Sequence, residues 1–353
     1  MTTSAPSVAR VLPSQETSSH HTAPLRNAVL KVRDLSVAFA SRGGALTAVD
    51  GVSFNLAAGE VMGIVGESGS GKSVTGLALM GLIGWPGRLT GGSVMLEGEE
   101  LIGMPESELR RIRGRRMAMI LQDPTSTLNP VLRIDTQMIE AIRAHDTVSE
   151  RAARERVCEM LSRVGIPSPR ERMLNYPHQF SGGMRQRIAI AIALLHRPAV
   201  LIADEATTAL DVSIQAQILA EVQSLAEEAG TAMIWITHDL SVVAGLADRI
   251  AVMYAGRLVE TGRVDQLLEA PAHPYTAGLI ACVPSHNIPG TEVAQIPGST
   301  PSLARLKAGC AFAPRCRRST AVCGQVPPLV SWGEASERSI RCFHPVIDIG
   351  ARS

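Results

Sequence analysis

The sequence predicts an α/β protein built around a mostly parallel β-sheet with helices on its faces. Three features of the chain support this fold class. An apolar run at 61–65 leads through a glycine-rich loop into a helical pattern that begins at Ser73. Two further apolar runs, 199–203 and 231–237, each end at polar residues, and helical patterns separate them. Such alternation of apolar strands and helices is typical of a parallel sheet covered by helices.

Length and composition limit the possible functions. A chain of 353 residues can form a large core and more than one domain. Its 34 Lys and Arg nearly balance its 33 Asp and Glu, so charge gives no argument for a nucleic-acid partner. No apolar run is long enough to span a bilayer. Residues 1–27 are rich in Ser, Thr, Pro and Ala and lack the apolar core of a signal peptide, so we expect a disordered tail and a cytosolic chain.

The structured part is expected to begin with strands at 30–39 and 48–56. The strand at 61–65 then enters Gly66–Ser73, which has the G-x-x-x-x-G-K-S spacing of a phosphate-binding loop. Glycines let this loop turn tightly and direct its N–H groups toward phosphate at the start of a helix. We therefore predict ATP binding, with Lys72 on the β- and γ-phosphates and Ser73 on Mg²⁺. The predicted nucleotide contacts are Gly66, Ser68, Gly69, Ser70, Gly71, Lys72, Ser73 and Val74.

The middle of the chain predicts a helical insert. A buried strand at 117–121 ends at Gln122, and about 60 residues with helical patterns follow, among them 136–145 and 149–164. We interpret residues 123–180 as a helical subdomain inserted in the core. A strong helical pattern then runs from Gly182 to His196 and ends before Pro198.

Four polar residues at strand ends are candidates for metal binding and catalysis. Asp204 follows the apolar strand at 199–203 and can hold Mg²⁺, while Glu205 can act as general base for the attacking water. Gln122 can contact both the metal and the water, and His238 can bind the γ-phosphate. Each residue alone has a simpler explanation, such as a helix cap for Asp-Glu or an ordinary histidine for His238.

The chain after about residue 270 has a different composition, so we predict a small cysteine-rich domain at 271–353. Four of the six cysteines in the whole chain fall near the C-terminus, whereas Cys158 and Cys282 stand alone as ordinary buried thiols. In a reducing compartment, four clustered thiols point to a metal rather than to disulfides. Neighbouring arginines, Arg315 among them, would favour the thiolate form. The predicted ligands are Cys310, Cys316, Cys323 and Cys342.

The order of these motifs resembles that of ABC-transporter ATPases over residues 28–265. The matching segments are 66–73, Gln122, 181–186, 201–205, 208–211 and 237–239. The resemblance implies a RecA-like P-loop core spanning 28–270 and a head-to-tail dimer in which each ATP lies between two domains. It also implies that Ser181, Gly182, Gly183 and Gln186 contact the ATP of the partner domain. Phe39 matches the position of an adenine-stacking aromatic, although an ordinary core role is equally open.

Longer phrases resemble the ATPase subunits of the oligopeptide/dipeptide importer family. They are 122–124, 128–130, 176–181, 209–217, 252–256 and 273–276. This resemblance implies a peripheral subunit on the cytoplasmic face of the membrane that powers peptide uptake and binds no nucleic acid. Its partners would be a second ATPase subunit, identical or different, two permease subunits and an extracytoplasmic solute-binding protein. Some members carry a [4Fe–4S] cluster in the cysteine-rich tail, while zinc or free thiols remain open here.

One position departs from the family pattern. Ala206 stands where proline usually follows the glutamate. Because proline stiffens the backbone, its absence would loosen the loop that holds Glu205.

Several functions also stay open. Importers of nickel or glutathione share these motifs, because selectivity belongs to the membrane subunits and the binding protein. A non-transport ABC ATPase acting on DNA or ribosomes is a further alternative, and a soluble P-loop kinase is disfavoured by the 181–186 segment and His238.

Overall fold

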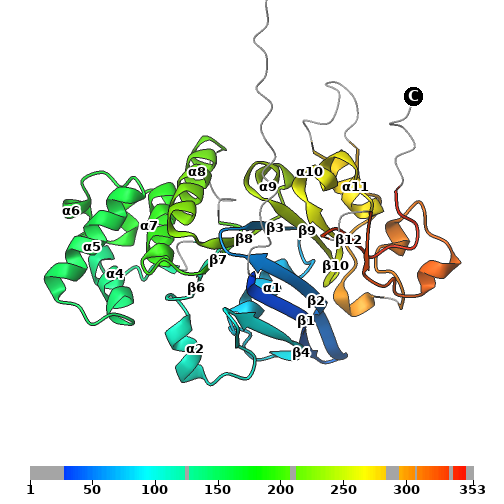
Figure 1. The fold of residues 1–353 in the computed structure, drawn as a ribbon, viewed down its shortest axis with the longest axis horizontal. Coiled ribbons are helices and arrows are strands. Elements are labelled where there is room, and N and C mark those ends of the chain that lie inside the picture. Colours follow the sequence, from blue (N-terminus) through cyan, green and yellow to red (C-terminus); the bar gives the residue numbers. More distant parts are fainter. Residues whose placement is uncertain are drawn as a thin grey trace, which may run out of the picture.

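The computed structural model describes residues 28–123, 127–206, 212–283, 294–306, 308–333 and 337–346. The predicted tail at 1–27 lies outside these ranges, as do Pro124 and the 208–211 segment. A central sheet carries a smaller sheet below it, a group of helices on one side and the C-terminal segment on the other (Figure 1).

Within the described residues, the central sheet contains eight strands in the order β11-β12-β10-β9-β3-β8-β7-β6. The strands from β9 to β6 run parallel, which confirms the prediction, whereas β10, β12 and β11 extend the sheet in antiparallel pairing. Every residue of β7 and β8 is buried, as their apolar sequences require. The strands span β3 (Val61–Val65), β6 (Met117–Ile120), β7 (Val200–Asp204), β8 (Ala232–Thr237), β9 (Arg249–Tyr254), β10 (Arg257–Arg263), β11 (Val330–Ser331) and β12 (Ser339–Ile340).

A second, antiparallel sheet has the strand order β2-β1-β4-β5. The two strands expected before the P-loop belong to it rather than to the central sheet. The sequence did not predict β4, because this strand contains several glycines and its first half is largely exposed, which obscures the apolar alternation. These strands span β1 (Ala28–Ser41), β2 (Gly44–Ala57), β4 (Gly87–Leu96) and β5 (Glu99–Glu100).

One hydrophobic core fills the space between the two sheets. Leu30 and Leu56 of the small sheet share it with Ile64 and Ile234 of the central sheet. Helix α1 (Lys72–Leu79) contacts β7 and β8 as well as β2, so both sheets fix the helix that receives the P-loop.

The helical subdomain contains the helices expected at 136–145 and 149–164, observed as α4 (Ile134–Arg143) and α5 (Glu150–Arg163). Ser149 starts α5 by accepting a 3.3 Å hydrogen bond from the N–H of Ala152. The short α6 (Pro169–Arg172) and a 3₁₀ helix (Pro177–Gln179) lead to α7 (Gly182–Leu194), which contacts β6, α5 and α8. The other helices of the core are α2 (Glu106–Ile112), α8 (Val212–Ala229), α9 (Leu240–Leu246) and α10 (Val264–Glu269).

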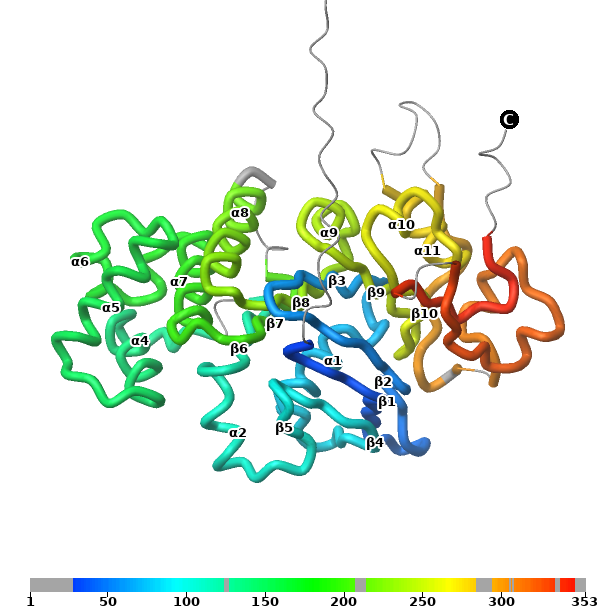
Figure 2. The backbone as a smooth tube through the Cα atoms, in the orientation of Figure 1, coloured from blue at the N-terminus to red at the C-terminus, as the bar shows by residue number. Residues whose placement is uncertain are grey.

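The C-terminal segment is continuous with the central sheet. After α11 (Pro274–Ala281), it folds back beside β10, coloured orange to red in Figure 2. Its strand β12 pairs with β10, so the sheet crosses the boundary expected near residue 270. Three short 3₁₀ helices explain its weak periodicity: Leu303–Arg305, Ala313–Arg315 and Ala321–Gly324.

Candidate functional site

The P-loop joins β3 to α1 and has the shape of an anion site. Gly71 caps α1 with φ 105° and no side-chain hydrogen bond, so the first N–H groups of the helix remain available to an anion. Glycine is also required sterically. A Cβ would lie 2.2 Å from the Met253 carbonyl oxygen at Gly66, and 2.5 Å from that of Ala48 at Gly71. The loop is therefore closely backed by β2 and β9.

Lys72 is buried within this loop. Its Nζ donates to the carbonyl oxygens of Gly66, at 2.8 Å, and Glu67, at 3.0 Å. Burial lowers the pKa of the ammonium, and the carboxylates of Glu205 and Asp204 oppose that shift. The lysine thus sits beside the helix terminus, where a phosphate chain would meet both.

The predicted metal-binding pair is brought together. The Ser73 hydroxyl donates to Asp204 Oδ1 at 2.9 Å, joining the start of α1 to the end of β7. Asp204 is 6% exposed, and burial raises the pKa of its carboxyl group. Among the described residues, no group of three or more His, Cys, Asp or Glu is arranged to hold a metal ion. Mg²⁺ needs few protein ligands, because water and substrate phosphates supply the rest.

The three predicted catalytic residues also meet. Gln122 Nε2 donates to Glu205 Oε2 at 2.8 Å, and His238 Nδ1 lies 3.2 Å from Glu205 Oε1. Each residue follows the end of one of the adjacent parallel strands β6, β7 and β8, which explains why they converge. Glu205 has a φ of 47°, in the left-handed region that residues other than glycine seldom adopt. Ala206 behind it is buried.

Other predicted nucleotide contacts lie around this centre. Ser68, Gly69 and Ser73 are exposed, whereas Ser70 is fully buried and Val74 packs against the core between the sheets. Phe39 is half-buried and also packs on this core. It pairs with Leu46 of β2, two residues from the Ala48 carbonyl that backs Gly71, so Phe39 lies close in the sheet to the P-loop.

The signature segment lies in the helical subdomain, apart from α1. Ser181 and Gly182 are exposed at the start of α7, and the Ser181 hydroxyl accepts from the N–H of Met184 at 3.3 Å. Gly183 is half-buried. Gln186, in contrast, is 1% exposed. The expectation that Gln186 contacts the nucleotide of a partner is therefore corrected, because one turn of helix carries its side chain into the interior.

The four C-terminal cysteines converge on one small cavity, which His273, Phe312 and His344 also line. A 2.9 Å backbone hydrogen bond joins Cys310 to Cys323. Burial, together with the other three cysteines, raises the pKa of the Cys342 thiol to about 11, and burial raises that of Cys310. The expectation that Arg315 favours the thiolate is wrong, because its guanidinium binds the carboxylate of Glu67 instead. The thiols converge, but no group of three or more His, Cys, Asp or Glu among the described residues, these cysteines included, is arranged to hold a metal ion. The metal centre therefore stays a prediction.

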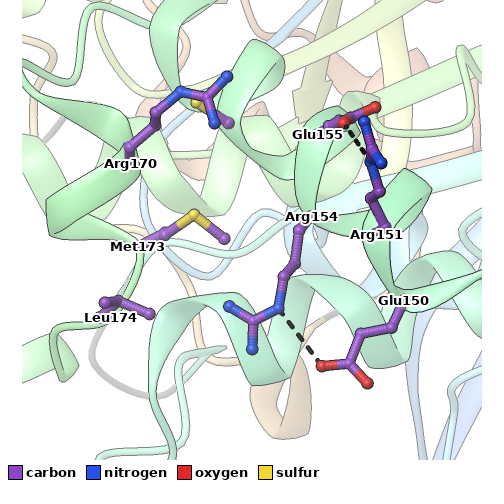
Figure 3. Close-up of a pocket in the computed structure, with 8 residues that line it drawn as sticks. Glu150, Arg151, Arg154, Glu155, Arg170, Met173 and Leu174 are labelled. Carbon is purple, nitrogen blue, oxygen red and sulfur yellow. Dashed lines mark hydrogen bonds and ion pairs between the residues drawn. The ribbon is translucent and has the colours of Figure 1, made fainter.

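A wide pocket of about 680 Å³ lies elsewhere, on the helical subdomain between α5 and α6 (Figure 3). Arg154 and Arg170 face it from the two helices, and the ion pairs Arg151–Glu155 and Arg154–Glu150 lie along α5. This pocket shares no residue with the P-loop. No described helix is long and apolar enough to cross a membrane.

Comparison with known proteins gives two matching families. The model of the ABC transporter family matches residues 49–208, and that of the oligopeptide/dipeptide transporter C-terminal region matches residues 259–323. The oligopeptide transport ATP-binding protein OppD of Salmonella typhimurium is 48% identical over 323 residues, covering 92% of this chain and 96% of OppD. The chain belongs to the OppD/DppD-type family of ABC-transporter ATPases. The dipeptide transport ATP-binding protein DppD of Bacillus subtilis is 49% identical over 85% of this chain and 90% of its own.

A solved structure agrees with this family. The dimeric post-hydrolysis state of the ATP-binding cassette MJ0796, bound to ADP and Pi, superimposes with a TM-score of 0.60 and 26% identity. The match covers 67% of this chain and 98% of the cassette. The predicted α/β fold of the ABC ATPase core is thereby confirmed. As an ABC-transporter ATPase, the chain binds and hydrolyses ATP.

The sequence interpretation of this ABC-transporter ATPase missed one set of contacts. Glu67, inside the P-loop, binds residues of the C-terminal segment more than 200 positions away. The only signal in the sequence is a carboxylate within a loop that must receive anionic phosphates.

Proposed function

We propose that this chain is an ATPase subunit of an importer that takes up peptides across the cytoplasmic membrane. The observation that carries the proposal is the similarity, over most of the chain, to transport ATP-binding proteins for oligopeptides and dipeptides. The match extends through the C-terminal region, which distinguishes this group from other ABC ATPases. The chain would act at the cytoplasmic face, with a second ATPase subunit, two permease subunits and an extracytoplasmic binding protein.

In this proposal Glu205 is the general base. It polarises water for in-line attack on the γ-phosphorus, while Gln122 and His238 orient the water and the γ-phosphate. The hydrogen-bond distances of Glu205 to both residues support these roles. Mg²⁺ would be held by Ser73 and Asp204, with Gln122 contributing, and it would neutralise charge on the phosphates when bound.

The signature would act on the partner's ATP. Exposed N–H groups at the start of a helix favour an anion, and Ser181 and Gly182 are exposed there. A second ATPase subunit meeting this surface head-to-tail would receive Ser181, Gly182 and Gly183 at its γ-phosphate. This arrangement leaves an isolated chain with an incomplete site.

The four cysteines would hold a [4Fe–4S] cluster with a structural role. Four thiolates are the usual ligand set of such a cluster, and the four cysteines line one cavity. The cluster would supply a cross-link to a segment whose helices and strands are all short. The ATP chemistry itself uses no redox group.

The assembly is tested by affinity purification of the tagged chain from membranes of its own cells. We expect two permease subunits, an ATPase partner and a peptide-binding protein. A crosslinker on Asn129, which follows the Gln122 strand and is exposed, should reach a permease. Co-purification with ribosomes or DNA, with no permease, would contradict the proposal. A nickel- or glutathione-binding protein in place of a peptide-binding one would correct the substrate alone.

A further inference from the structure

Glu67 is the second residue of the P-loop, and each of its polar groups is bound. Its N–H donates to the hydroxyl of Tyr275 at 2.9 Å, and its carbonyl oxygen accepts from Lys72. Its carboxylate accepts from Thr300 Oγ1 at 2.7 Å and from Arg315. Tyr275, Thr300 and Arg315 all come from the C-terminal segment. The phosphate-binding loop is therefore attached to a part of the chain outside the ATPase core.

The contact between Arg315 and Glu67 is bidentate. Arg315 Nη1 lies 2.6 Å from Glu67 Oε2, and Nη2 lies 2.9 Å from Oε1. Only 6% of the Arg315 side chain is exposed, and its Nε donates to the carbonyl oxygen of Pro297 at 2.8 Å. The arginine lowers the pKa of the Glu67 carboxyl group, which stays ionised. Charge-assisted pairs with this planar geometry are strong and directional, and a partly buried carboxylate is destabilised when it loses its cationic partner.

Tyr275 is held as firmly. Its side chain is fully buried and packs edge-on against Tyr254, with ring centroids 4.6 Å apart. Phe312 packs against both rings and lies two residues after Cys310 in the segment that carries the cysteines. The Tyr275 hydroxyl accepts a hydrogen bond from the Glu67 N–H, and the packing of the three aromatic rings holds that hydroxyl in place.

These contacts hold Glu67, whose carbonyl oxygen is bound by the phosphate-binding Lys72. Lys72 Nζ binds the carbonyl oxygens of Gly66 and Glu67, so the orientation of these two peptide groups determines where the ammonium rests. Without Arg315, the peptide groups would lose an anchor. The Glu67 carboxylate would also be left without its cationic partner beside the site of a highly charged anion, where like charges repel.

We propose that Arg315 is a positioning residue of the ATP site, which holds Glu67 so that the first half of the P-loop keeps its phosphate-binding shape. Arg315 touches no phosphate in this arrangement. It acts through Glu67, and Tyr275 acts in the same way through the Glu67 N–H. The C-terminal segment then sets the affinity of the chain for ATP.

The test uses the full-length chain and measures the Kd of ATP with a fluorescent ATP analogue, together with KM and kcat for hydrolysis. Arg315→Met should raise the Kd and KM at least about tenfold, with kcat changed less, because Glu205 and its partners are untouched. Arg315→Lys should recover part of the affinity, since it keeps the charge but loses the bidentate contact. Arg317→Met is the matched control, because this neighbouring arginine is exposed and should leave the Kd unchanged.

Two further variants separate positioning from general damage. Tyr275→Phe keeps the aromatic packing and removes only the hydroxyl, so it should weaken ATP binding even if Arg315→Met folds poorly. In a Glu67→Gln background, Arg315→Met should raise the Kd of ATP by a smaller factor than in the wild type, because no carboxylate is left without its cationic partner. Wild-type affinity in folded Arg315→Met and in Tyr275→Phe would overturn the proposal. Since binding to the isolated chain requires neither permease nor peptide, this result is independent of the transport function.

Discussion

The carboxylate of Glu205 lies 3.2 Å from the imidazole Nδ1 of His238, although 33 positions separate the two residues. Each follows the end of one of two adjacent parallel strands, β7 and β8. Gln122, after the neighbouring strand β6, donates to the other oxygen of the same carboxylate. One edge of the sheet thus collects a carboxylate, an amide and an imidazole beside the P-loop, which suits activation of water next to a phosphate.

Glu205→Gln should abolish turnover while ATP still binds. The substitution preserves the size of the side chain and an oxygen for Gln122, but it removes the charge that polarises water. We expect a loss of at least on the order of 10²-fold in kcat with little change in the Kd of ATP. Phosphate release and fluorescent-nucleotide binding measure the two quantities.

Lys72→Ala is the contrasting variant, because Lys72 belongs to the phosphate-binding loop, where its Nζ contacts the carbonyl oxygens of Gly66 and Glu67. It should weaken ATP binding itself. Hydrolysis by Glu205→Gln at the wild-type rate would show that another group serves as the base.

Ser181→Arg should block the site of a partner subunit without affecting ATP binding to this chain. Ser181 is exposed at the start of α7, where a long cationic side chain would occupy the space of the partner's γ-phosphate. Ser181→Thr, which keeps the hydroxyl cap, serves as the control. Binding and hydrolysis are measured in the isolated chain and in the assembled transporter. If Ser181→Arg abolished ATP binding by the isolated chain, the arrangement between subunits would be refuted.

Protein purified without oxygen should be brown and contain iron and acid-labile sulfide, each near four per chain, as expected for a [4Fe–4S] cluster. Cys316→Ser should reduce both together, because the cavity would lose one of its four thiols. Cys158→Ser is the matched control, since Cys158 lies in the helical subdomain. Finding about one zinc per chain and no iron would mean that the cysteines hold zinc instead of a cluster. Colourless protein with neither metal would reject the centre.

Stability should fall below pH 6.5 because of His273. This histidine is 1% exposed, and burial lowers its pKa from 6.5 to about 3. Between these values the unfolded chain binds a proton that the folded chain does not, so the free energy of unfolding decreases by about 1.4 kcal/mol per pH unit from this group. Urea unfolding at pH 7, 6 and 5 measures the slope.

His273→Asn isolates this contribution. His273 Nδ1 accepts the N–H of Tyr275 at 3.0 Å as the cap of α11, and an asparagine oxygen can replace it without titrating. The variant should show a shallower dependence on pH between 7 and 5. Equal slopes for the two proteins would mean that His273 does not contribute.

The sequence predicted the parts of the site that follow from local chemistry. The residues 199–203 are apolar enough to require a buried strand, and the ends of parallel strands meet at one edge of the sheet. The sequence alone therefore predicted that Asp204 and Glu205 lie at this edge. Ser181 could be predicted as a helix start, because a helical pattern begins directly after it. The burial of Gln186 could not be predicted, because a helix that is buried on all sides shows no clear apolar periodicity.

The contacts of the C-terminal segment lay beyond sequence reasoning. Its 3₁₀ helices and two-residue strands leave no pattern, so nothing in the sequence indicated that β12 would pair with β10. The attachment of Glu67 to Arg315 joins residues 248 positions apart. Only long-range packing creates that pair, and the residue type at position 67 is not constrained by the phosphate-binding spacing.

The most direct test of the account is ATP-driven uptake by the reconstituted transporter. The wild-type chain or Glu205→Gln would be assembled with its permeases and partner ATPase in vesicles, with the binding protein and labelled peptides on the side opposite the ATPases. The account predicts that peptide accumulates only with ATP and the wild-type chain, at a rate proportional to hydrolysis. Hydrolysis that proceeds without uptake of any peptide, or peptide uptake unchanged by Glu205→Gln, would contradict it.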